Sequence, residues 1–298
     1  MSIHHDILTH INPVLRIVKR VTDFVKIQNS NSLRVLIFHD IPPHQEKAFE
    51  NQIHWLKMRW NIITPETFEL MLSGSIPVIG NNLLITFDDG LKSNRIIAEK
   101  VLNPMGIKAI FFIISDFVSI KDKDESHKFI ADYIMPNSDI LSVPGNWSNM
   151  GWDDLEALLD QGHTIGGHTK THKRLSDCTY SSELEDEIIN SAVNIENRLG
   201  IDLNHFAYTF GNIQSFSELA LLKAEEKFSY IYSGIRGDNC NLDAHPFVIR
   251  RDAAAYQLSN NEYILFKDKL LESFLMGFAD FHYSSDRRKI DLWNSKDK

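Results

Sequence analysis

Short hydrophobic runs alternate with amphipathic segments along most of the chain. The runs have the length of buried strands, and the segments between them repeat hydrophobic residues at helical spacing, as at Phe49, Ile53 and Leu56. A further helix is predicted to begin at Pro65 with Thr64 as its N-cap. Strands that alternate with helices are typical of a parallel sheet with helical crossovers. The expected strands are RVLIFH (34–39), NII (61–63), LLITF (83–87), KAIFFII (108–114), HTIGG (163–167), HFAYTFG (205–211), YIYSGI (230–235) and FVIRR (247–251).

Three regions depart from this alternation and suggest the domain limits. Residues 13–27 predict a basic amphipathic helix, which packs on the domain or, as the alternative, contacts an anionic membrane surface. Residues 115–150 are polar and are expected to form an elaborated loop. We therefore expect an N-terminal helical extension over 1–31, a main domain over 32–280 and a polar C-terminal tail over 281–298.

Composition and charge narrow the classes of protein. The chain has 298 residues, 43% of them hydrophobic, and a formal net charge of -9, which disfavours nucleic acid as a partner. Two cysteines are too few for a disulfide framework. The N-terminus lacks a signal-peptide pattern, and the longest strongly apolar run, 109–114, is too short to span a bilayer. We expect a cytoplasmic protein that is at most peripheral to a membrane.

Polar residues follow several of the expected strands. In parallel α/β folds, functional residues gather at the carboxyl ends of strands, which would bring His168, His172 and the pair Asp88-Asp89 together. The two histidines are four residues apart, so on one face of a helical turn they could share a metal ion. Because Gly90 frees the backbone, one carboxylate could complete the ligand set and the other could act as a base. The alternative is an ordinary turn that caps the next helix.

Two motifs stand in register, LLITFDDG (83–90) and GHTIGGHTKTHKRL (162–175). They resemble the T-F-D-D-G and H-[ST]-x-x-H motifs of the polysaccharide deacetylase family, the NodB-homology group of carbohydrate esterases. Further segments in the same order extend the similarity over about residues 33–275. The resemblance implies a distorted (β/α)7 barrel with a metal ion at its mouth.

The resemblance also implies roles for individual residues. Asp89, His168 and His172 would bind one divalent metal ion, most often zinc in this family and otherwise cobalt or nickel. Asp88 would be the catalytic base. The backbone N–H of Phe210, in AYTFG, would help to form the oxyanion hole.

The general acid and the residue that orients the base depart from the common pattern. A late L-x-H motif is not recognisable, but one branch of the family carries the equivalent strand early, and LIFH (36–39) resembles it. His39 is therefore the candidate acid, with a purely positioning role as its alternative, and His245, His282 or a water as other sources of the proton.

A second departure concerns the third motif, R-x-P-Y-G in much of the family and Y-P-F-G in the early-histidine branch. Ala207 stands in the place of the arginine and Thr209 in that of the proline. Arg250 or Arg251 could replace the arginine. Alternation along a strand lets only one of them face inward, and of the two we favour Arg251. A surface ion-pair role stays open for either residue as the alternative.

The predicted function is that of a metal-dependent hydrolase that removes the N-acetyl group from an amino sugar in a polysaccharide or glycan precursor. Hydrolysis of another linear amide, such as a formamide on a lipid-linked sugar, is the near alternative. A carbohydrate-binding barrel without turnover is the alternative from another class, because Ala207 and Thr209 depart from the pattern. The expected partner is an N-acylated sugar or glycan.

Overall fold

The structure is a computed structural model that describes residues 31–136, 138–240, 247–258 and 262–294. The helix expected over 13–27 lies outside these ranges, as does His245. Within the described ranges, no helix has both the length and the apolar character needed to cross a lipid bilayer.

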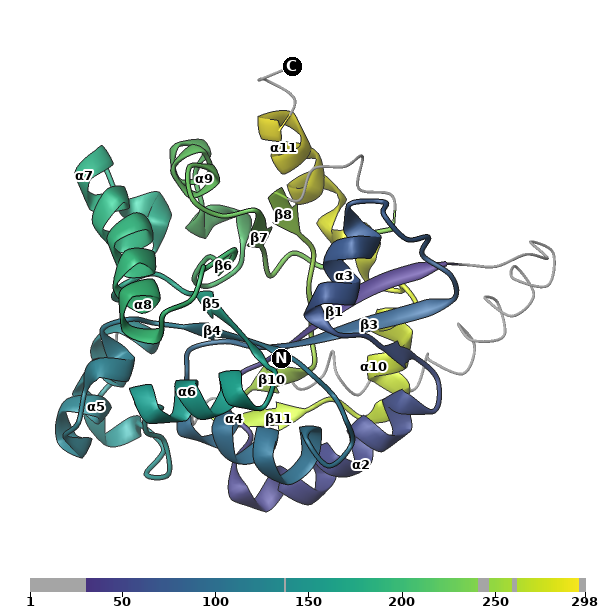
Figure 1. Cartoon of the computed structure of the whole chain (residues 1–298), viewed down its shortest axis with the longest axis horizontal. Helices are drawn as coiled ribbons and strands as arrows, with labels where there is room; N and C mark the ends of the chain where they lie inside the picture. The colour runs from purple at the N-terminus through teal and green to yellow at the C-terminus, as the bar shows by residue number, and fades with distance from the viewer. Residues whose placement is uncertain (1–30, 137, 241–246, 259–261, 295–298) are drawn as a thin grey trace.

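A curled parallel sheet forms the centre of the molecule, and helices lie around its outer side (Figure 1). The strand order is β8-β7-β6-β5-β4-β3-β1-β9, and the short β2 pairs with β3. This confirms the α/β class and the curled parallel sheet. The expected (β/α)7 count is not confirmed, because the sheet has nine strands in the described residues. The strands are β1 (Ser32–Phe38), β2 (Asn61–Ile62), β3 (Asn81–Phe87), β4 (Ile110–Ile113), β5 (Thr164–Gly167), β6 (His205–Ala207), β7 (Tyr230–Tyr232), β8 (Phe247–Ile249) and β9 (Asp252–Ala253).

The two edges of this sheet are joined by a very short stretch of chain. β8 pairs with β7 at one edge and β9 pairs with β1 at the other, and only Arg250 and Arg251 separate β8 from β9. Because one nearly continuous segment serves both edges, the sheet curls back on itself at this point. The carboxyl ends of its strands therefore surround a common central region.

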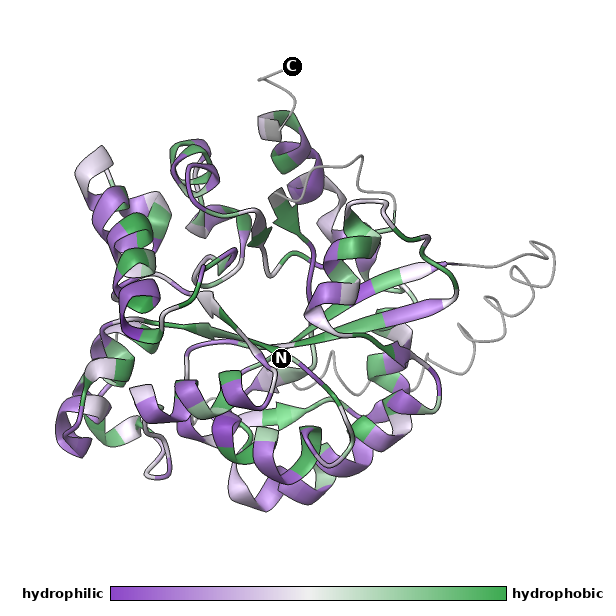
Figure 2. Ribbon diagram, in the orientation of Figure 1, coloured by the Kyte–Doolittle hydropathy of each residue, from purple (hydrophilic) through white to green (hydrophobic). Residues whose placement is uncertain are grey.

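Alternate residues of the strands enter two different hydrophobic layers. Phe38, Phe87 and Phe111 form an outward row of stacked rings, with centroids 5.4 and 5.0 Å apart, that packs against the surrounding helices. Leu84 and Phe112 belong to the other layer. Since both faces are covered, the strands read as continuous apolar runs. In Figure 2 the strands are largely hydrophobic and the outer faces of the helices largely hydrophilic.

Most helices cover the outer side of the sheet. Thr64 caps α3 as expected, since its hydroxyl oxygen accepts from the Thr67 N–H at 3.2 Å. The helices of the barrel are α2 (Glu46–Lys57), α3 (Pro65–Leu72), α4 (Lys92–Ile97) with its continuation η2 (Ala98–Leu102), α6 (Trp152–Asp160), the consecutive α7 (Ser181–Leu184), η7 (Glu185–Asn190) and α8 (Ser191–Leu199), then α9 (Glu218–Glu225) and α10 (Asp268–Leu275).

The region 115–150 is not the loop that its polar composition predicts. Phe117, Phe129 and Trp147 are buried in a small core of their own there. Their wide separation in a polar sequence obscured the pattern of a packed unit. Its helices are η3 (Phe117–Ser119), α5 (Lys123–Phe129), η4 (Ile130–Ile134) and η5 (Ile140–Ser142).

Two C-terminal features also differ from the expectation. A hairpin, β10 (Ala255–Gln257) and β11 (Tyr263–Leu265), follows β9 and was not anticipated. The segment expected to be a polar tail contains η9 (Asp280–Tyr283) and α11 (Ser284–Asn294). Ile290 of α11 is only 4% exposed and joins the main core, so a single buried face is enough to dock this otherwise polar helix.

His163, directly before β5, is a buried structural histidine. Its Nδ1 accepts the backbone N–H of Ala109 at 3.2 Å, and its Nε2 lies 3.0 Å from Asn103 Oδ1. An imidazole that accepts at one nitrogen is neutral and can donate at the other. Burial, together with the nearby charges of Lys108 and Arg95, lowers the pKa of His163 to about 4.

We expect His163 to make the protein less stable as the pH falls through this range. Because its pKa in the folded state lies below the ordinary 6.5, the unfolded chain binds the extra proton first. Its contribution is complete above pH 6.5 and is lost progressively towards pH 4, with a slope of at most about 1.4 kcal/mol per pH unit. We would measure the free energy of unfolding by urea at several pH values across this range. It should change less steeply with pH in His163→Gln than in wild type. His54→Gln, at an exposed site on α2, is the control, and equal slopes for wild type and His163→Gln would contradict the assignment.

Candidate active site

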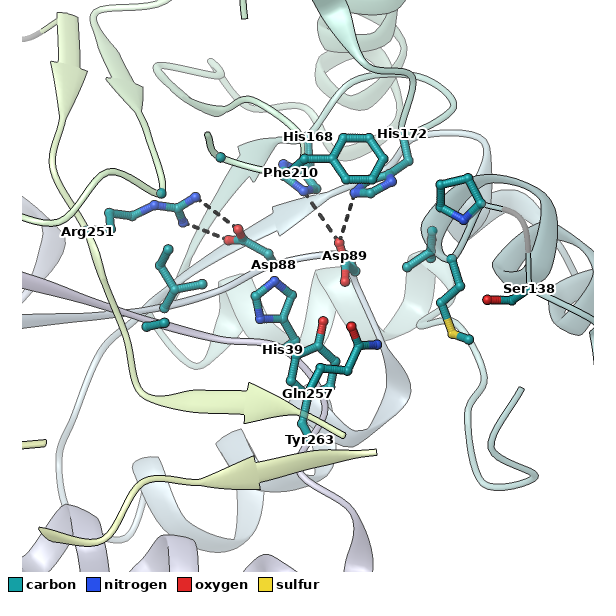
Figure 3. Close-up of a pocket in the computed structure, with 17 residues that line it drawn as sticks. His39, Asp88, Asp89, Ser138, His168, His172, Phe210, Arg251, Gln257 and Tyr263 are labelled. Atoms are coloured by element: carbon teal, nitrogen blue, oxygen red, sulfur yellow. Dashed lines mark hydrogen bonds and ion pairs between the residues drawn. The ribbon is translucent and has the colours of Figure 1, made fainter. Parts of the chain in front are cut away.

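The carboxyl ends of the strands open into one pocket of about 480 Å³. The residues selected from the sequence come from β1, β3, β5, β6 and the junction between β8 and β9, and Figure 3 shows them around this pocket. The pocket is lined by His39, Asp88, Asp89, His168, His172, Phe210 and Arg251, together with residues that the sequence did not single out.

The backbone reverses at Asp89, which is how two adjacent carboxylates reach one site. The Asp88 N–H still donates to Phe38 O at 2.9 Å, so Asp88 continues the ladder between β3 and β1. Asp89 and Gly90 then take left-handed conformations, with φ of 74° and 78°. Asp89 itself, and not only the glycine after it, therefore makes the turn, and aspartate is among the residues that tolerate this conformation.

Left-handed backbone is concentrated at this site. Asp89, Thr169, His172 and Phe210 all have positive φ, and Val248 is the one other non-glycine residue of the described chain that does. Such conformations cost about 1–2 kcal/mol each and persist where the surrounding structure imposes them.

The two histidines do not lie on a helical turn, so that prediction was wrong. His168 continues the ladder, since its N–H donates to Ile113 O at 2.9 Å, and the residues that follow form a loop. Within that loop the His172 N–H donates to Thr169 Oγ1 at 3.0 Å. The left-handed turns at Thr169 and His172 return the second imidazole to the first without a helix.

Asp89, His168 and His172 form a buried triad that fits a divalent cation. Asp89 Oδ1 lies 3.4 Å from His168 Nε2 and 3.5 Å from His172 Nε2. The other ring nitrogens, both Nδ1, donate to backbone carbonyls, to Ala207 O at 2.6 Å and to Tyr133 O at 2.9 Å. A carbonyl only accepts, so each Nδ1 carries a hydrogen, and Nε2 is the nitrogen of each ring that faces Asp89. When a ring is neutral, its Nε2 lone pair is free to bind a cation. This is the tautomer of metal-binding histidines.

Burial and neighbouring charges set the protonation of the triad. Burial would raise the pKa of Asp89, but the hydrogen bond from His168 and the nearby histidines hold it well below its usual range. Burial lowers the pKa of His172 to about 4, so this ring is neutral at pH 7. The pKa of His168 is raised despite burial, because its ring bonds to Asp89. A cation at the triad would compete with that proton for Nε2.

Asp88 is paired with a buried arginine. Arg251, 1% exposed, donates from Nη1 to Asp88 Oδ1 at 2.7 Å and from Nη2 to Asp88 Oδ2 at 2.9 Å. Its Nε donates to Ser233 O at 2.8 Å, which fixes the plane of the guanidinium. Burial would raise the pKa of Asp88, but Arg251 and His168 together hold it below its ordinary value. The carboxylate is therefore ionised and oriented at neutral pH.

Of the two candidate arginines, Arg251 alone reaches Asp88. The neighbouring Arg250 donates to Asp238 O at 3.0 Å and lies 3.6 Å from Asp291, on the other side of the segment. Alternation along the extended β8–β9 stretch accounts for this difference.

Phe210 lies beside the triad on a tightly packed loop. Its ring centroid is 4.7 Å from that of His172, and the Arg174 guanidinium lies 4.1 Å above the Phe210 ring. A Cβ added to the next residue, Gly211, would lie 2.7 Å from Gly234 Cα, so this approach requires glycine. The packing fixes the backbone at Phe210, whose oxyanion role stays a prediction.

His39 lies in the same pocket, whereas His282 does not line it. His39 follows β1, next to the strand that carries Asp88, and its carbonyl accepts from Asn94 Nδ2 at 2.6 Å. His282, in η9, packs against Phe281 with centroids 3.9 Å apart.

Sequence analysis missed the residues that complete the walls of the pocket. Tyr263 and Gln257 come from the unanticipated hairpin, and both side chains point into the pocket in Figure 3. The short apolar run YILF (263–266) is the signal that could have revealed β11. Another wall is formed by Ile134, Met135, Pro136 and Ser138.

Comparisons with known proteins agree with this architecture. The family model for Polysaccharide deacetylase matches residues 77–227, and the chain belongs to that family. The protein is thus an enzyme of the deacetylase class. The matched range contains the triad, Asp88 and Phe210, but neither His39 nor Arg251.

Individual relatives are distant in sequence. A Bacillus subtilis protein, YxkH, named provisionally as a polysaccharide deacetylase, is 24% identical over 241 residues, which cover 79% of this chain and 72% of that protein. Three solved structures share the fold, each with a TM-score of 0.59. They are IcaB from Ammonifex degensii (22% identity, 75% of this chain and 92% of that one), the polysaccharide deacetylase BC0361 from Bacillus cereus (18%, 82% and 69%) and a de-N-acetylase from Aggregatibacter actinomycetemcomitans (15%, 81% and 98%).

If the triad binds one divalent ion, metal analysis of the purified protein should approach one equivalent and His172→Ala should lose most of it. The loss follows because a three-ligand site depends on each ligand. His205→Ala, which removes a buried histidine bonded to Glu69 and Tyr232, is the control and should keep the metal. Full occupancy in His172→Ala would rule out the assignment.

Substitutions of the two carboxylates should have different effects on metal content and turnover. Asp88→Asn removes a base but no proposed ligand, so turnover should fall by about 10² or more while the metal stays bound. Asp89→Asn should lose metal as well as activity. Metal content and turnover of both variants are the measurements. If Asp88→Asn lost the metal and Asp89→Asn kept it, Asp88 would be the ligand and Asp89 the base.

Proposed function

We propose that the protein is a metal-dependent hydrolase that removes the N-acetyl group from an amino sugar in a polysaccharide or glycan precursor. The observation that carries the proposal is the buried Asp89–His168–His172 triad beside an ionised, arginine-paired Asp88. A ligand set next to a separate base is what hydrolysis of an unactivated amide requires. The name of the de-N-acetylase that shares this fold is consistent with such a substrate.

The chain's own residues account for attack on the carbonyl. A divalent cation held by the triad, with zinc first and cobalt or nickel next, would polarise the amide carbonyl and lower the pKa of water. Asp88 accepts the proton of the attacking water, and Arg251 keeps Asp88 ionised and in plane. The Phe210 N–H donates to the oxyanion that develops on the substrate.

His39 is the proposed source of the proton that the leaving amine needs. As the C–N bond breaks, a protonated His39 transfers its proton to the amine nitrogen and becomes neutral. Its place after β1, in the pocket that holds Asp88 and Asp89, supports this role. The proposal places the protein in the branch of the family whose acid histidine comes early in the chain.

Residues Ala207 and Thr209, which depart from the family pattern, still make contacts that support the site. Ala207 contributes its carbonyl to His168, and Thr209 Oγ1 donates to Lys173 O at 2.7 Å. The guanidinium that Ala207 cannot supply reaches Asp88 from Arg251. These contacts favour a hydrolase over a barrel that only binds carbohydrate.

The direct test is release of acetate from N-acetylglucosamine oligomers by the metal-loaded protein. We expect turnover with wild type and at least about 10²-fold less with Asp88→Asn. Release of formate from an N-formyl sugar, without any release of acetate, would favour the linear-amide alternative. Binding of the oligomers without release of either acid would overturn the hydrolase.

The role of His39 can be tested by changing the leaving group. His39→Ala should lose about 10²- to 10⁴-fold in kcat/KM on an N-acetyl sugar, but much less on an activated ester whose leaving group needs no proton. The metal content should not change. His282→Ala is the control. Equal losses on both substrates would mean that His39 positions the site or binds the sugar.

A further inference from the structure

The ring of His39 stacks on the ring of Tyr263. The centroids are 4.8 Å apart and the planes differ by 3°, and Figure 3 shows both side chains on the same side of the pocket. Among the described residues, the hydrogen bond of His39 is made by its backbone carbonyl and not by its ring. Stacking is thus the contact that sets the plane of the imidazole, whose χ2 rotation is otherwise broad.

Tyr263 is held in turn by a buried tryptophan. The Trp147 ring lies 6.0 Å from the Tyr263 ring, with planes 14° apart. Trp147 is 2% exposed, and its indole N–H donates to Asp40 Oδ2 at 2.8 Å. Asp40 directly follows His39 in the chain. The contacts from His39 through Tyr263 and Trp147 therefore lead back to the residue next to the proposed acid.

The backbone of Tyr263 is fixed from the opposite direction. Gln45 Nε2 donates to Tyr263 O at 2.6 Å, and Gln45 Oε1 accepts from the Leu265 N–H at 3.2 Å. One buried carboxamide therefore binds β11 on both sides of Ile264. Gln52 Nε2 donates to Phe266 O at 2.7 Å one step further on.

We propose that Tyr263 is a positioning residue that holds the imidazole of His39 in the plane required to protonate the leaving amine. The inference rests on the proposed function of His39 as the general acid. It makes the β10–β11 hairpin, which the matched family range does not include, part of the apparatus that cleaves the amide. Tyr263 acts through its ring face, and the hydroxyl is not needed for this role.

The test compares two substitutions of Tyr263 on two substrates. Tyr263→Leu removes the aromatic face and should lower kcat on an N-acetyl sugar by about 10- to 100-fold, the scale of a misplaced catalytic group. On an activated ester the loss should be under about threefold, with unchanged metal content. Tyr263→Phe keeps the face and should stay within about threefold of wild type on both. Equal losses in the Phe and Leu variants would show that the hydroxyl matters, and would overturn the proposal.

A double-mutant cycle separates this inference from the function on which it rests. If Tyr263 acts through His39, adding Tyr263→Leu to His39→Ala should cause little further loss on the amide. Additive losses would overturn the inference while His39 kept its role. If His39→Ala shows no loss selective for the amide, the acid assignment itself fails, whatever Tyr263 does.

Tyr256→Leu is the matched control for a general weakening of the hairpin. Tyr256 lies on β10, and its ring packs on Phe266 with centroids 5.5 Å apart and does not line the pocket. The control should lower the thermal stability without changing the ratio of amide to ester activity. A change in that ratio as large as that of Tyr263→Leu would make the effect a structural one, and the proposal would fall.

Discussion

Two adjacent carboxylates are buried at the end of a hydrophobic strand, and the site is arranged around the need to compensate them. Asp88 and Asp89 are 4% and 2% exposed. An isolated charge in such a place would cost several kcal/mol or more, or would be neutralised by a proton. The two charges have different partners, because Arg251 compensates Asp88 whereas His168, and a cation where one is bound, compensate Asp89. This division gives the two carboxylates different chemistry.

The compensation of Asp88 depends on the closure of the sheet. Arg251 lies in the short junction between β8 and β9, so its guanidinium reaches Asp88 only when both sheet edges are in place. A cluster of ion pairs around Arg34 also stabilises this junction. Arg34 of β1 lies 3.2 Å from Asp252 of β9 and 2.7 Å from Asp280 of η9. Closing the sheet and pairing Asp88 with Arg251 are therefore one structural event.

Segments outside the sheet contribute residues that line the pocket and orient its rings. The compact unit over 115–150 contributes the Tyr133 carbonyl that sets the tautomer of His172, and also an apolar wall. The C-terminal hairpin contributes Tyr263 against His39. The two sequence motifs thus lie at the ends of strands in the sheet, while the orientations of the His172 and His39 rings depend on elements outside those motifs. Substrate choice in the pocket would follow from the same two walls.

The alternation of apolar runs was enough to predict the α/β class. The motifs T-F-D-D-G and H-x-x-x-H were enough to select Asp88, Asp89, His168 and His172. Both predictions succeed because strand ends and short motifs are local properties of a chain. Local properties could not show that Asp89 turns left-handed, that the histidines meet without a helix, or that the polar stretch 115–150 packs around Phe117 and Trp147. Those outcomes depend on contacts between distant segments. The same holds for the choice of Arg251 over Arg250, and for the stacking of Tyr263 on His39, residues from opposite ends of the described chain. Only the curled sheet, by closing on itself, brings such residues within bonding distance.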